Sequence, residues 1–153
     1  GLDDGRLALY ALVHDLVEAY AGDISVRADD ATLAQKAARE HKAFQRIRVS
    51  YKNTAPWIAR LIEDYEARCD AEARFIYSVD KHMGALTRLA LNGERIEEYY
   101  PHPDGSHYKL VVARLREKAA IYPELLEFFD ELHDQLDIVR HERVQNSTQA
   151  GGT

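Results

Sequence analysis

Apolar residues recur along the chain at steps of three and four, the spacing that places side chains on one face of an α-helix. One such run occupies residues 4–21, and the pattern predicts further helices after it. These cover residues 30–51, 56 to about 68, 71 to about 92, 107–121 and 123–143. No stretch shows the alternation of polar and apolar residues that is typical of a strand. The pattern therefore predicts an all-α fold, a single bundle of about six helices.

Capping residues and helix breakers support these boundaries. Asp3 or Asp4 can cap the first helix and Asp70 the fourth, because a short acidic side chain accepts hydrogen bonds from the free amides of a first turn. Gly22 is the residue type that commonly ends a helix. The segment 99–106 contains proline and glycine, and we interpret it as a loop.

The helical stripes also predict which side chains are buried. We expect Leu12 on the apolar face of the first helix, and Trp57 in the core rather than in a platform that stacks on a base. In the fourth helix the apolar stripe includes Met83 and Leu86, whereas His82 is expected on the helix surface. The last helix has an apolar row that favours a homodimer interface. That row comprises Leu125, Phe128, Phe129, Leu132, Leu136 and Val139.

Length and composition fit a single domain. A chain of 153 residues can bury about two thirds of its unfolded surface. We expect one domain over residues 1–144 and a disordered polar tail over 145–153. No apolar run is long enough to cross a bilayer. The lone cysteine, Cys69, excludes an internal disulfide and favours the reducing cytoplasm.

The charge pattern limits the class of partner. The net charge is -6, with acidic and basic residues interspersed. Nucleic acid is therefore not expected as the main partner, because its phosphates are bound by concentrated positive charge. A site for phosphate compounds in this chain needs a metal ion or a few well-placed Lys and Arg side chains.

Ionisable side chains interrupt the apolar pattern of the first predicted helix. His14 and Asp15 are adjacent, and Glu18 follows one turn after His14 on the same helix face. Asp23 comes directly after Gly22, where the helix is expected to end. Burying such groups without partners would cost several kcal/mol each. We therefore expect them to be tied to a cation, to one another or to a substrate.

This ordered set resembles the HD-domain superfamily of metal-dependent phosphohydrolases, and in particular its small 5'-deoxynucleotidase branch. The residues that carry the resemblance are His14-Asp15, Glu18, Gly22-Asp23 and the distant Asp80. Further residues match in order and approximate spacing: Lys36, Arg39, Glu40, Ala43, Trp57, Asp64, Tyr65, Glu66, Ala71, Glu72 and Ala73. The likeness covers about residues 7–91.

The resemblance implies a divalent metal held by His14, Asp15 and Asp80, and it implies acid or base roles for Glu18 and Asp23. Which of these two carboxylates donates the proton stays open. Mixed imidazole and carboxylate ligands suit Mn, Co, Fe, Ni or Zn better than calcium. The family completes its site with a histidine on a preceding helix, so we expect this domain to lack its N-terminal helix.

Lys36 and Arg39 are candidates for contact with phosphate, because the second predicted helix should pass near the site. Lys36 also stands four residues before Glu40, a spacing that is typical of an ion pair on a solvated helix face. For Lys36 the sequence is therefore compatible with contact to phosphate and with an ion pair to Glu40 on the helix surface.

Two groups of residues near the predicted loop leave alternatives open. His102, Asp104 and His107 are ligand-type residues, for which a surface loop is favoured over a second metal site. Tyr99 and Tyr100 could stack on a base or cover an oligomer interface.

Together these expectations favour an enzyme, a divalent-metal-dependent phosphohydrolase that converts deoxynucleoside 5'-monophosphates to nucleoside and phosphate. One alternative is a nucleoside triphosphate hydrolase of the same superfamily, and product analysis distinguishes it. The other is a non-catalytic HD-type module that binds nucleotides or regulates a partner, and metal analysis tests it.

Overall fold

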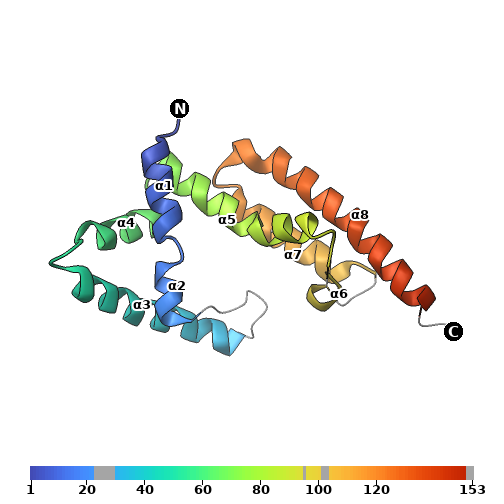
Figure 1. Cartoon of the computed structure of the whole chain (residues 1–153), viewed down its shortest axis with the longest axis horizontal. Coiled ribbons are helices and arrows are strands. Elements are labelled where there is room, and N and C mark those ends of the chain that lie inside the picture. Colours follow the sequence, from blue (N-terminus) through green and yellow to red (C-terminus); the bar gives the residue numbers. More distant parts are fainter. Residues whose placement is uncertain (23–29, 95, 101–103, 151–153) are drawn as a thin grey trace. The chain divides into compact units, whose positions relative to one another are not determined.

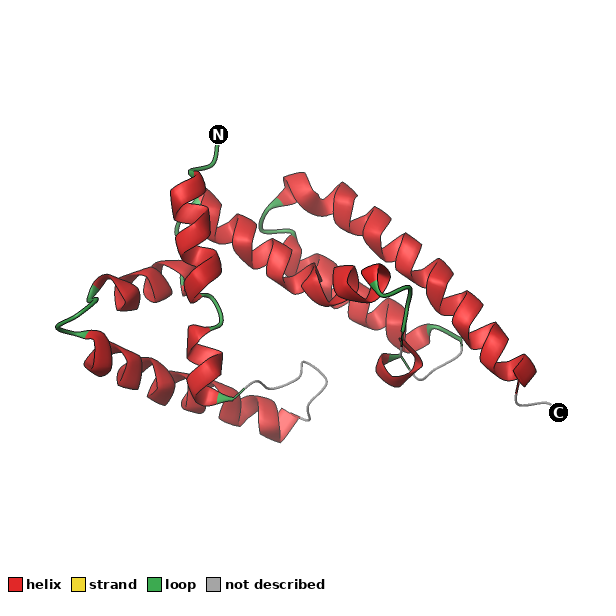
Figure 2. Cartoon of the chain, in the orientation of Figure 1, coloured by secondary structure: helices red, strands yellow, loops and turns green. Residues whose placement is uncertain are grey.

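A computed structural model describes residues 1–22, 30–94, 96–100 and 104–150 (Figure 1). Within these ranges every regular element is a helix, and there is no strand (Figure 2). The elements are α1 (Asp4–Val13), α2 (Leu16–Ala21), α3 (Asp30–Tyr51), α4 (Trp57–Glu66), α5 (Ala71–Ala90), α6 (Ile96–Tyr99), α7 (Ser106–Ala119), the 3-10 helix η1 (Pro123–Leu125) and α8 (Leu126–Ala150). The predicted all-α fold class is therefore confirmed.

The first predicted helix, over residues 4–21, is in fact two helices. α1 ends with His14 as its C-cap residue, whose amide still donates to the carbonyl of Tyr10. Asp15 then leaves the helical conformation, with φ -95° and ψ 0°, and serves as the N-cap of α2. Aspartate is among the residue types that favour the N-cap position. The spacing of apolar residues did not reveal this break, because only one residue leaves the helical conformation. The break places His14 and Asp15, two of the three predicted ligands, at a junction between helices.

The predicted caps are present where the structure describes them. Asp3 accepts a hydrogen bond from the amide of Arg6, and Asp70 accepts one from the amide of Ala73 in the first turn of α5. Gly22 ends α2 with φ 81°, a left-handed value that glycine adopts without strain.

The last helix extends beyond its expected end. α8 continues to Ala150, so residues 145–150 are helical and the expected disordered tail is wrong for them. Residues 151–153 lie outside the described part of the chain. The segment is polar, but it holds no proline and no glycine before Gly151, and such a composition weakens a helix without ending it.

The chain forms two compact units, residues 1–76 and residues 77–153. The boundary falls inside α5, which runs without interruption from Ala71 to Ala90. The single domain over 1–144 stays a prediction.

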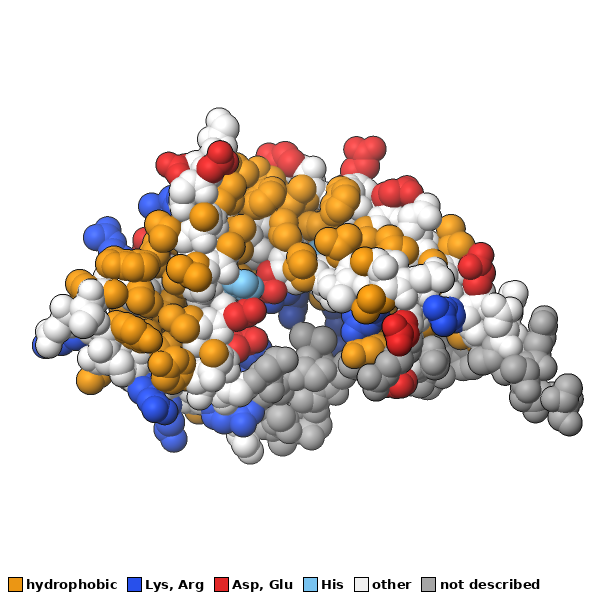
Figure 3. Space-filling view, viewed as in Figure 1, with side chains coloured by type: hydrophobic (Ala, Val, Ile, Leu, Met, Phe, Trp, Pro, Cys, Tyr) orange, Lys and Arg blue, Asp and Glu red, His pale blue; other side chains and the backbone are white. Residues whose placement is uncertain are grey.

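In the first unit, α1 packs on α4, and α2 and α4 pack on α3. The buried core residues are Val13, Val17, Ala43, Ile47 and Ile62. Leu12 and Trp57 were expected inside but are 70% and 48% exposed. Figure 3 shows hydrophobic side chains gathered over the helices of this unit. The buried positions of α1 are Tyr10 and Val13, so Leu12 is not on the face of α1 that packs inward.

In the second unit, α6, α7 and η1 pack on α8. The buried core residues are Ala85, Ile96, Tyr100, Tyr108, Leu132 and Leu136. The apolar row of α8 that favoured a homodimer therefore lies largely inside its own unit, although Phe128 remains 55% exposed. The homodimer stays a prediction, but most of the apolar row of α8 that suggested it is not available as an interface.

The buried face of α5 differs from the predicted stripe. Met83 and Leu86 are exposed, whereas Ser78 and His82 are buried. The His82 ring stacks on Phe129 with ring centroids 3.6 Å apart, so the expected surface position is wrong. Facing aromatic residues of α8 give the imidazole a packing partner that periodicity along α5 cannot reveal.

Candidate metal centre

The junction between α1 and α2 presents an imidazole and a carboxylate side by side. His14 Nε2 lies 3.1 Å from Asp15 Oδ2. The carboxylate sits at the N-cap of α2 yet makes no capping hydrogen bond there. The side chain of His14 is 24% exposed and that of Asp15 67% exposed, so an ion can reach both from solvent.

The ring of His14 is oriented for ligation by a hydrogen bond to its own helix. Its Nδ1 lies 2.7 Å from the carbonyl oxygen of Ala11. Because a carbonyl only accepts, the proton of the neutral ring belongs on Nδ1, and Nε2 keeps its lone pair. Metal-bound histidines commonly show this arrangement, since the second nitrogen fixes the tautomer and the ring direction.

The distance between the two ligand atoms suits a shared ion. Atoms that each lie about 2.1 Å from one transition-metal ion are about 3 to 3.4 Å apart in tetrahedral or octahedral geometry. The separation of 3.1 Å between His14 Nε2 and Asp15 Oδ2 falls in that range. Both residues could therefore hold a metal ion.

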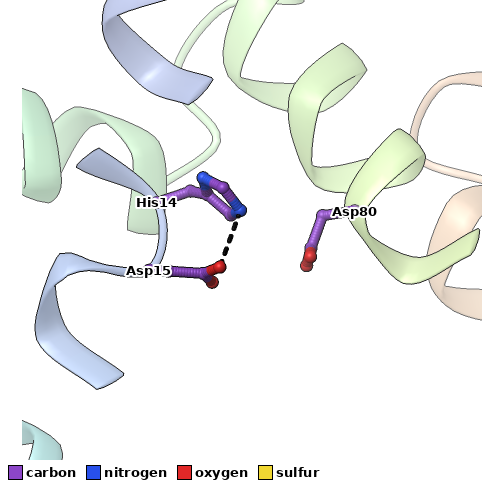
Figure 4. Close-up of side chains that lie close together, drawn as sticks. All are labelled: His14, Asp15 and Asp80. Carbon is purple, nitrogen blue, oxygen red and sulfur yellow. Dashed lines mark ion pairs between the residues drawn. The ribbon is translucent and has the colours of Figure 1, made fainter. Parts of the chain in front are cut away.

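Figure 4 draws these two side chains together with Asp80, the third predicted ligand. Asp80 belongs to the second unit and lies on α5. Its side chain is 25% exposed, and its Oδ2 is 2.6 Å from the Nζ of Lys81. The expected partial burial of Asp80 is present. A metal bound by this oxygen would have to compete with the ammonium group.

Glu18 lies in the first turn of α2 and pairs with the second predicted helix. Lys36 Nζ is 3.1 Å from Glu18 Oε1 and 3.4 Å from Glu40 Oε1. Burial lowers the pKa of Lys36, but the hydrogen bond and charge of Glu18, with a contribution from Glu40, raise it above its ordinary value. The predicted pair with Glu40 therefore exists, and Lys36 also holds the Glu18 carboxylate in place.

A pocket of about 520 Å³ opens next to these residues within the first unit. Its lining comprises His14, Val17, Glu18, Glu40, His41, Phe44, Ile62, Glu63, Glu66 and Ala67. Pockets of this size suit small-molecule ligands. Glu40 was predicted only as an ion-pair partner of Lys36 and as part of the family resemblance, and Glu66 only as part of that resemblance. His41 and Glu63 were not predicted as site residues. Helical spacing puts Glu63 and Glu66 on one face of α4, but it does not say which face of a helix lines a pocket.

The other candidate residues fall elsewhere. Asp23 and His102 lie outside the described residues. Arg39 is exposed on α3. Asp104 accepts hydrogen bonds from the amide and hydroxyl of Ser106, at the start of α7, which fits the favoured loop interpretation.

Tyr99 and Tyr100 are used within the second unit. Tyr100 is buried in the core, with its ring centroid 4.9 Å from that of Tyr108. The guanidinium carbon of Arg88 lies 3.8 Å from the ring centroid of Tyr99. Packing inside the unit accounts for both aromatic rings.

The HD domain family matches residues 1–121 of this sequence. The chain therefore belongs to the HD domain family, and the resemblance predicted from its residues is confirmed.

Two curated proteins are similar to this chain, one over most of its length and the other over about half of it. A cattle (Bos taurus) protein named 5'-deoxynucleotidase HDDC2 is 32% identical over 118 residues, which cover 72% of this chain and 57% of that protein. The human (Homo sapiens) protein of the same name is 33% identical over 81 residues, which cover 52% of this chain and 39% of that protein. The chain thus spans about half the length of the curated relatives that it matches. No solved structure matches it.

None of the helices in the described ranges is both long enough and apolar enough to cross a membrane.

Proposed function

We propose that this protein is a divalent-metal-dependent phosphohydrolase that acts on deoxynucleoside 5'-monophosphates. The observation that carries the proposal is the His14–Asp15 pair, with its fixed tautomer and its ligand atoms 3.1 Å apart. Membership of the HD domain family supports it, as does the similarity to proteins named 5'-deoxynucleotidase. A cytoplasmic location and a homodimer belong to the proposal as expectations from the sequence.

In this proposal His14 and Asp15 hold the cation, with Asp80 as a third ligand. Asp80 is included because of the family resemblance and because its carboxylate is partly buried. When bound, the ion supplies an activated water and neutralises charge on the phosphoryl oxygens. Mn, Co, Fe, Ni or Zn would suit the imidazole and carboxylate donors.

Glu18 is the proposed acid or base of the reaction. Hydrolysis forms a bond between a water oxygen and phosphorus, breaks the bond to the 5'-oxygen and requires a proton on that leaving oxygen. The carboxylate of Glu18 lines the pocket beside His14, and the ammonium group of Lys36 orients it from 3.1 Å. Asp23 keeps its predicted role beside Glu18, and contact of Lys36 and Arg39 with phosphate stays part of the proposal.

The proposal is tested by measuring metal binding to the purified, unmodified chain and by identifying the products that it releases. Purified protein, stripped of metal and then supplied with manganese or cobalt, is incubated with deoxynucleoside mono-, di- and triphosphates. We expect free phosphate and nucleoside from the monophosphates, with activity that depends on the added metal.

Two results would contradict the proposal and point to its rivals. Preferential turnover of triphosphates, with release of triphosphate or pyrophosphate, would indicate a triphosphate hydrolase of the same superfamily. Absence of metal binding and of metal-stimulated turnover would indicate a non-catalytic nucleotide-binding or regulatory module. Asp15→Asn should abolish the activity, while Asp134→Asn, a change of an exposed aspartate on α8, serves as the matched control.

A further inference from the structure

The outer face of α3 and the start of α4 carry positive charge, most of which the proposed reaction does not use. The one carboxylate between residues 37 and 60, that of Glu40, is partly buried and pairs with Lys36. Six basic side chains of the same stretch are exposed: Arg39, Lys42, Arg46, Arg48, Lys52 and Arg60. None of the six forms an ion pair with a carboxylate of the described residues. Figure 3 shows basic side chains over α3. This surface therefore lacks an anionic partner within the described part of its own chain.

We propose that the outer face of α3 docks on α8 of a second copy of this chain, through a basic row on one helix and an acidic row on the other. The inference goes beyond the proposed hydrolysis and does not depend on it. It assigns the expected homodimer to a surface other than the apolar row of α8, which is largely buried in its own unit.

The basic row of α3 faces away from the core of its unit. Lys42, Arg46 and Val49 follow one another at steps of four and three residues, which places them on one side of the helix. Ala43 and Ile47 are instead buried in the core. Val49 is 73% exposed, so the row includes an apolar side chain that nothing in its own unit covers.

The acidic row lies on α8. Residues 124–139 contain six acidic side chains and no lysine or arginine. Glu127, Glu131 and Ile138 are separated by four and seven residues, so they share one side of the helix, while Leu136 is buried in the core. Both glutamates are exposed and form no ion pair with a described residue, and Ile138 is 52% exposed. This row therefore also combines unpaired charge with an uncovered apolar side chain.

The two rows match in spacing. Lys42 lies seven residues before Val49, and Glu131 lies seven residues before Ile138. Seven residues are about two turns, or about 10 Å along a helix. Two parallel helices therefore bring Lys42 to Glu131 where Val49 meets Ile138. The apolar contact would remove exposed hydrophobic surface from water, and the ion pair would fix the register.

Like charges repel one another within each row. Lys42 and Arg46 are four residues apart, as are Glu127 and Glu131, and like charges at this spacing destabilise a helix. Docking of one row on the other sets attractions between the helices against both repulsions. The basic row therefore has its electrostatic complement on α8.

The charge of the whole chain favours this occupant over a foreign polyanion. The net charge is -6, so a nucleic acid or an anionic membrane drawn to α3 would be repelled by the rest of the surface. A second copy offers its acidic row to α3 and its basic row to α8 of the first. In a two-fold dimer the same contact is made twice.

The experiment measures the oligomeric state of the purified, unmodified chain by analytical ultracentrifugation in sodium chloride. We expect a dimer at about 0.1 M salt whose dissociation constant rises about tenfold or more by about 1 M, because the screening length falls from about 10 Å to about 3 Å. A monomer at the lower salt concentration overturns the inference, and so does a dimer that is insensitive to salt.

Charge reversal tests which residues are in contact. Lys42→Glu and Glu131→Lys each replace an attraction by a repulsion in both contacts of the dimer, so each should raise the dissociation constant about tenfold or more. An equal mixture of the two variants should form dimers again, because every contact of the mixed dimer joins opposite charges. The control is Lys109→Glu, the same change at an exposed lysine of α7, which should leave the dimer intact.

The remaining results each contradict the inference. Dimers that both variants leave unchanged place the interface elsewhere. Weakening by both variants without recovery in the mixture overturns the pairing of Lys42 with Glu131. A monomer that binds vesicles of phosphatidylcholine and phosphatidylserine, or single-stranded DNA, and loses this binding in Lys42→Glu assigns the basic row to that polyanion. None of these measurements uses phosphate release, so failure of the inference and failure of the proposed function are distinguishable.

Discussion

His14 in the first unit and His82 in the second are oriented in the same way but have opposite surroundings. Each ring has its Nδ1 near a carbonyl oxygen of its own helix, Ala11 for His14 at 2.7 Å and Ser78 for His82 at 3.0 Å. In the neutral ring this leaves the lone pair on Nε2 in both cases. The Nε2 of His14 then faces the carboxylate of Asp15 at a helix junction.

The Nε2 of His82 is instead buried and has no hydrogen-bond partner among the described residues. Its ring stacks on Phe129, and the ring of His133 lies 5.2 Å away, also with a buried Nε2. Burial lowers the pKa of His82 more than the hydrogen bond to Ser78 raises it. The comparison shows that an ordered imidazole becomes a candidate ligand only where an anionic partner and solvent access accompany it.

The strongest test of the comparison is His14→Ala. We expect manganese affinity to fall more than about 100-fold, because loss of an outer partner of a metal ligand already costs about 10- to 100-fold. Calorimetric titration measures it. The control is His141→Ala, which removes another histidine beside an aspartate, with Nδ1 3.4 Å from Asp137 Oδ1. Equal affinity in the His14 variant and the control would show that the junction is not a metal site.

The next effect concerns packing in the second unit. His82→Ala removes a ring that is 2% exposed and stacked on Phe129, and we expect the free energy of unfolding to fall by about 2 to 4 kcal/mol. His82→Phe keeps the ring and removes the buried Nε2, so its loss should be smaller. Chemical denaturation followed by circular dichroism measures both. A loss below about 1 kcal/mol for the alanine variant would contradict a core role.

The smallest effect is the pH dependence of stability that His133 introduces. Burial, with a further contribution from His82, lowers the pKa of His133 from 6.5 to about 4, against an opposing contribution from Asp130. Between these values the unfolded chain binds a proton and the folded chain does not, so stability falls as the pH drops below 6.5. At pH 5 we expect a loss of about 2 kcal/mol relative to pH 7.5.

His133→Phe should remove that part of the pH dependence. The hydroxyl of Tyr108 can still donate to the backbone carbonyl of residue 133, from 2.7 Å. Denaturation of both proteins at pH 7.5 and pH 5 makes the comparison. An identical loss of stability in the variant would show that another group is responsible.

Local features of this fold followed from the sequence. The bounds of α3, the cap at Asp3 and the helix end at Gly22 were predicted, because each depends on residues within one or two turns. Features that depend on distant residues were not. The burial of His82 depends on Phe129, and the exposure of Trp57 depends on how α4 packs.

The candidate site divides in the same way. The pairing of Lys36 with Glu40 follows from helical spacing, whereas its contact with Glu18 joins α3 to α2. The pocket combines residues of α2, α3 and α4, and no single helix contains its pattern of carboxylates and apolar side chains. Residues Glu63 and His41 could be recognised as lining only once those helices were in place.

The order of residues alone determined that the chain is helical and that its ionisable groups match the HD family, because helix periodicity and motif spacing are properties of neighbouring positions. Tertiary structure decided that His14 and Asp15 meet at a break between two helices, and that His82 packs against an aromatic ring. The physical reason is that the surroundings of a side chain, and with them its protonation and available partners, are set by the atoms packed around it from other helices.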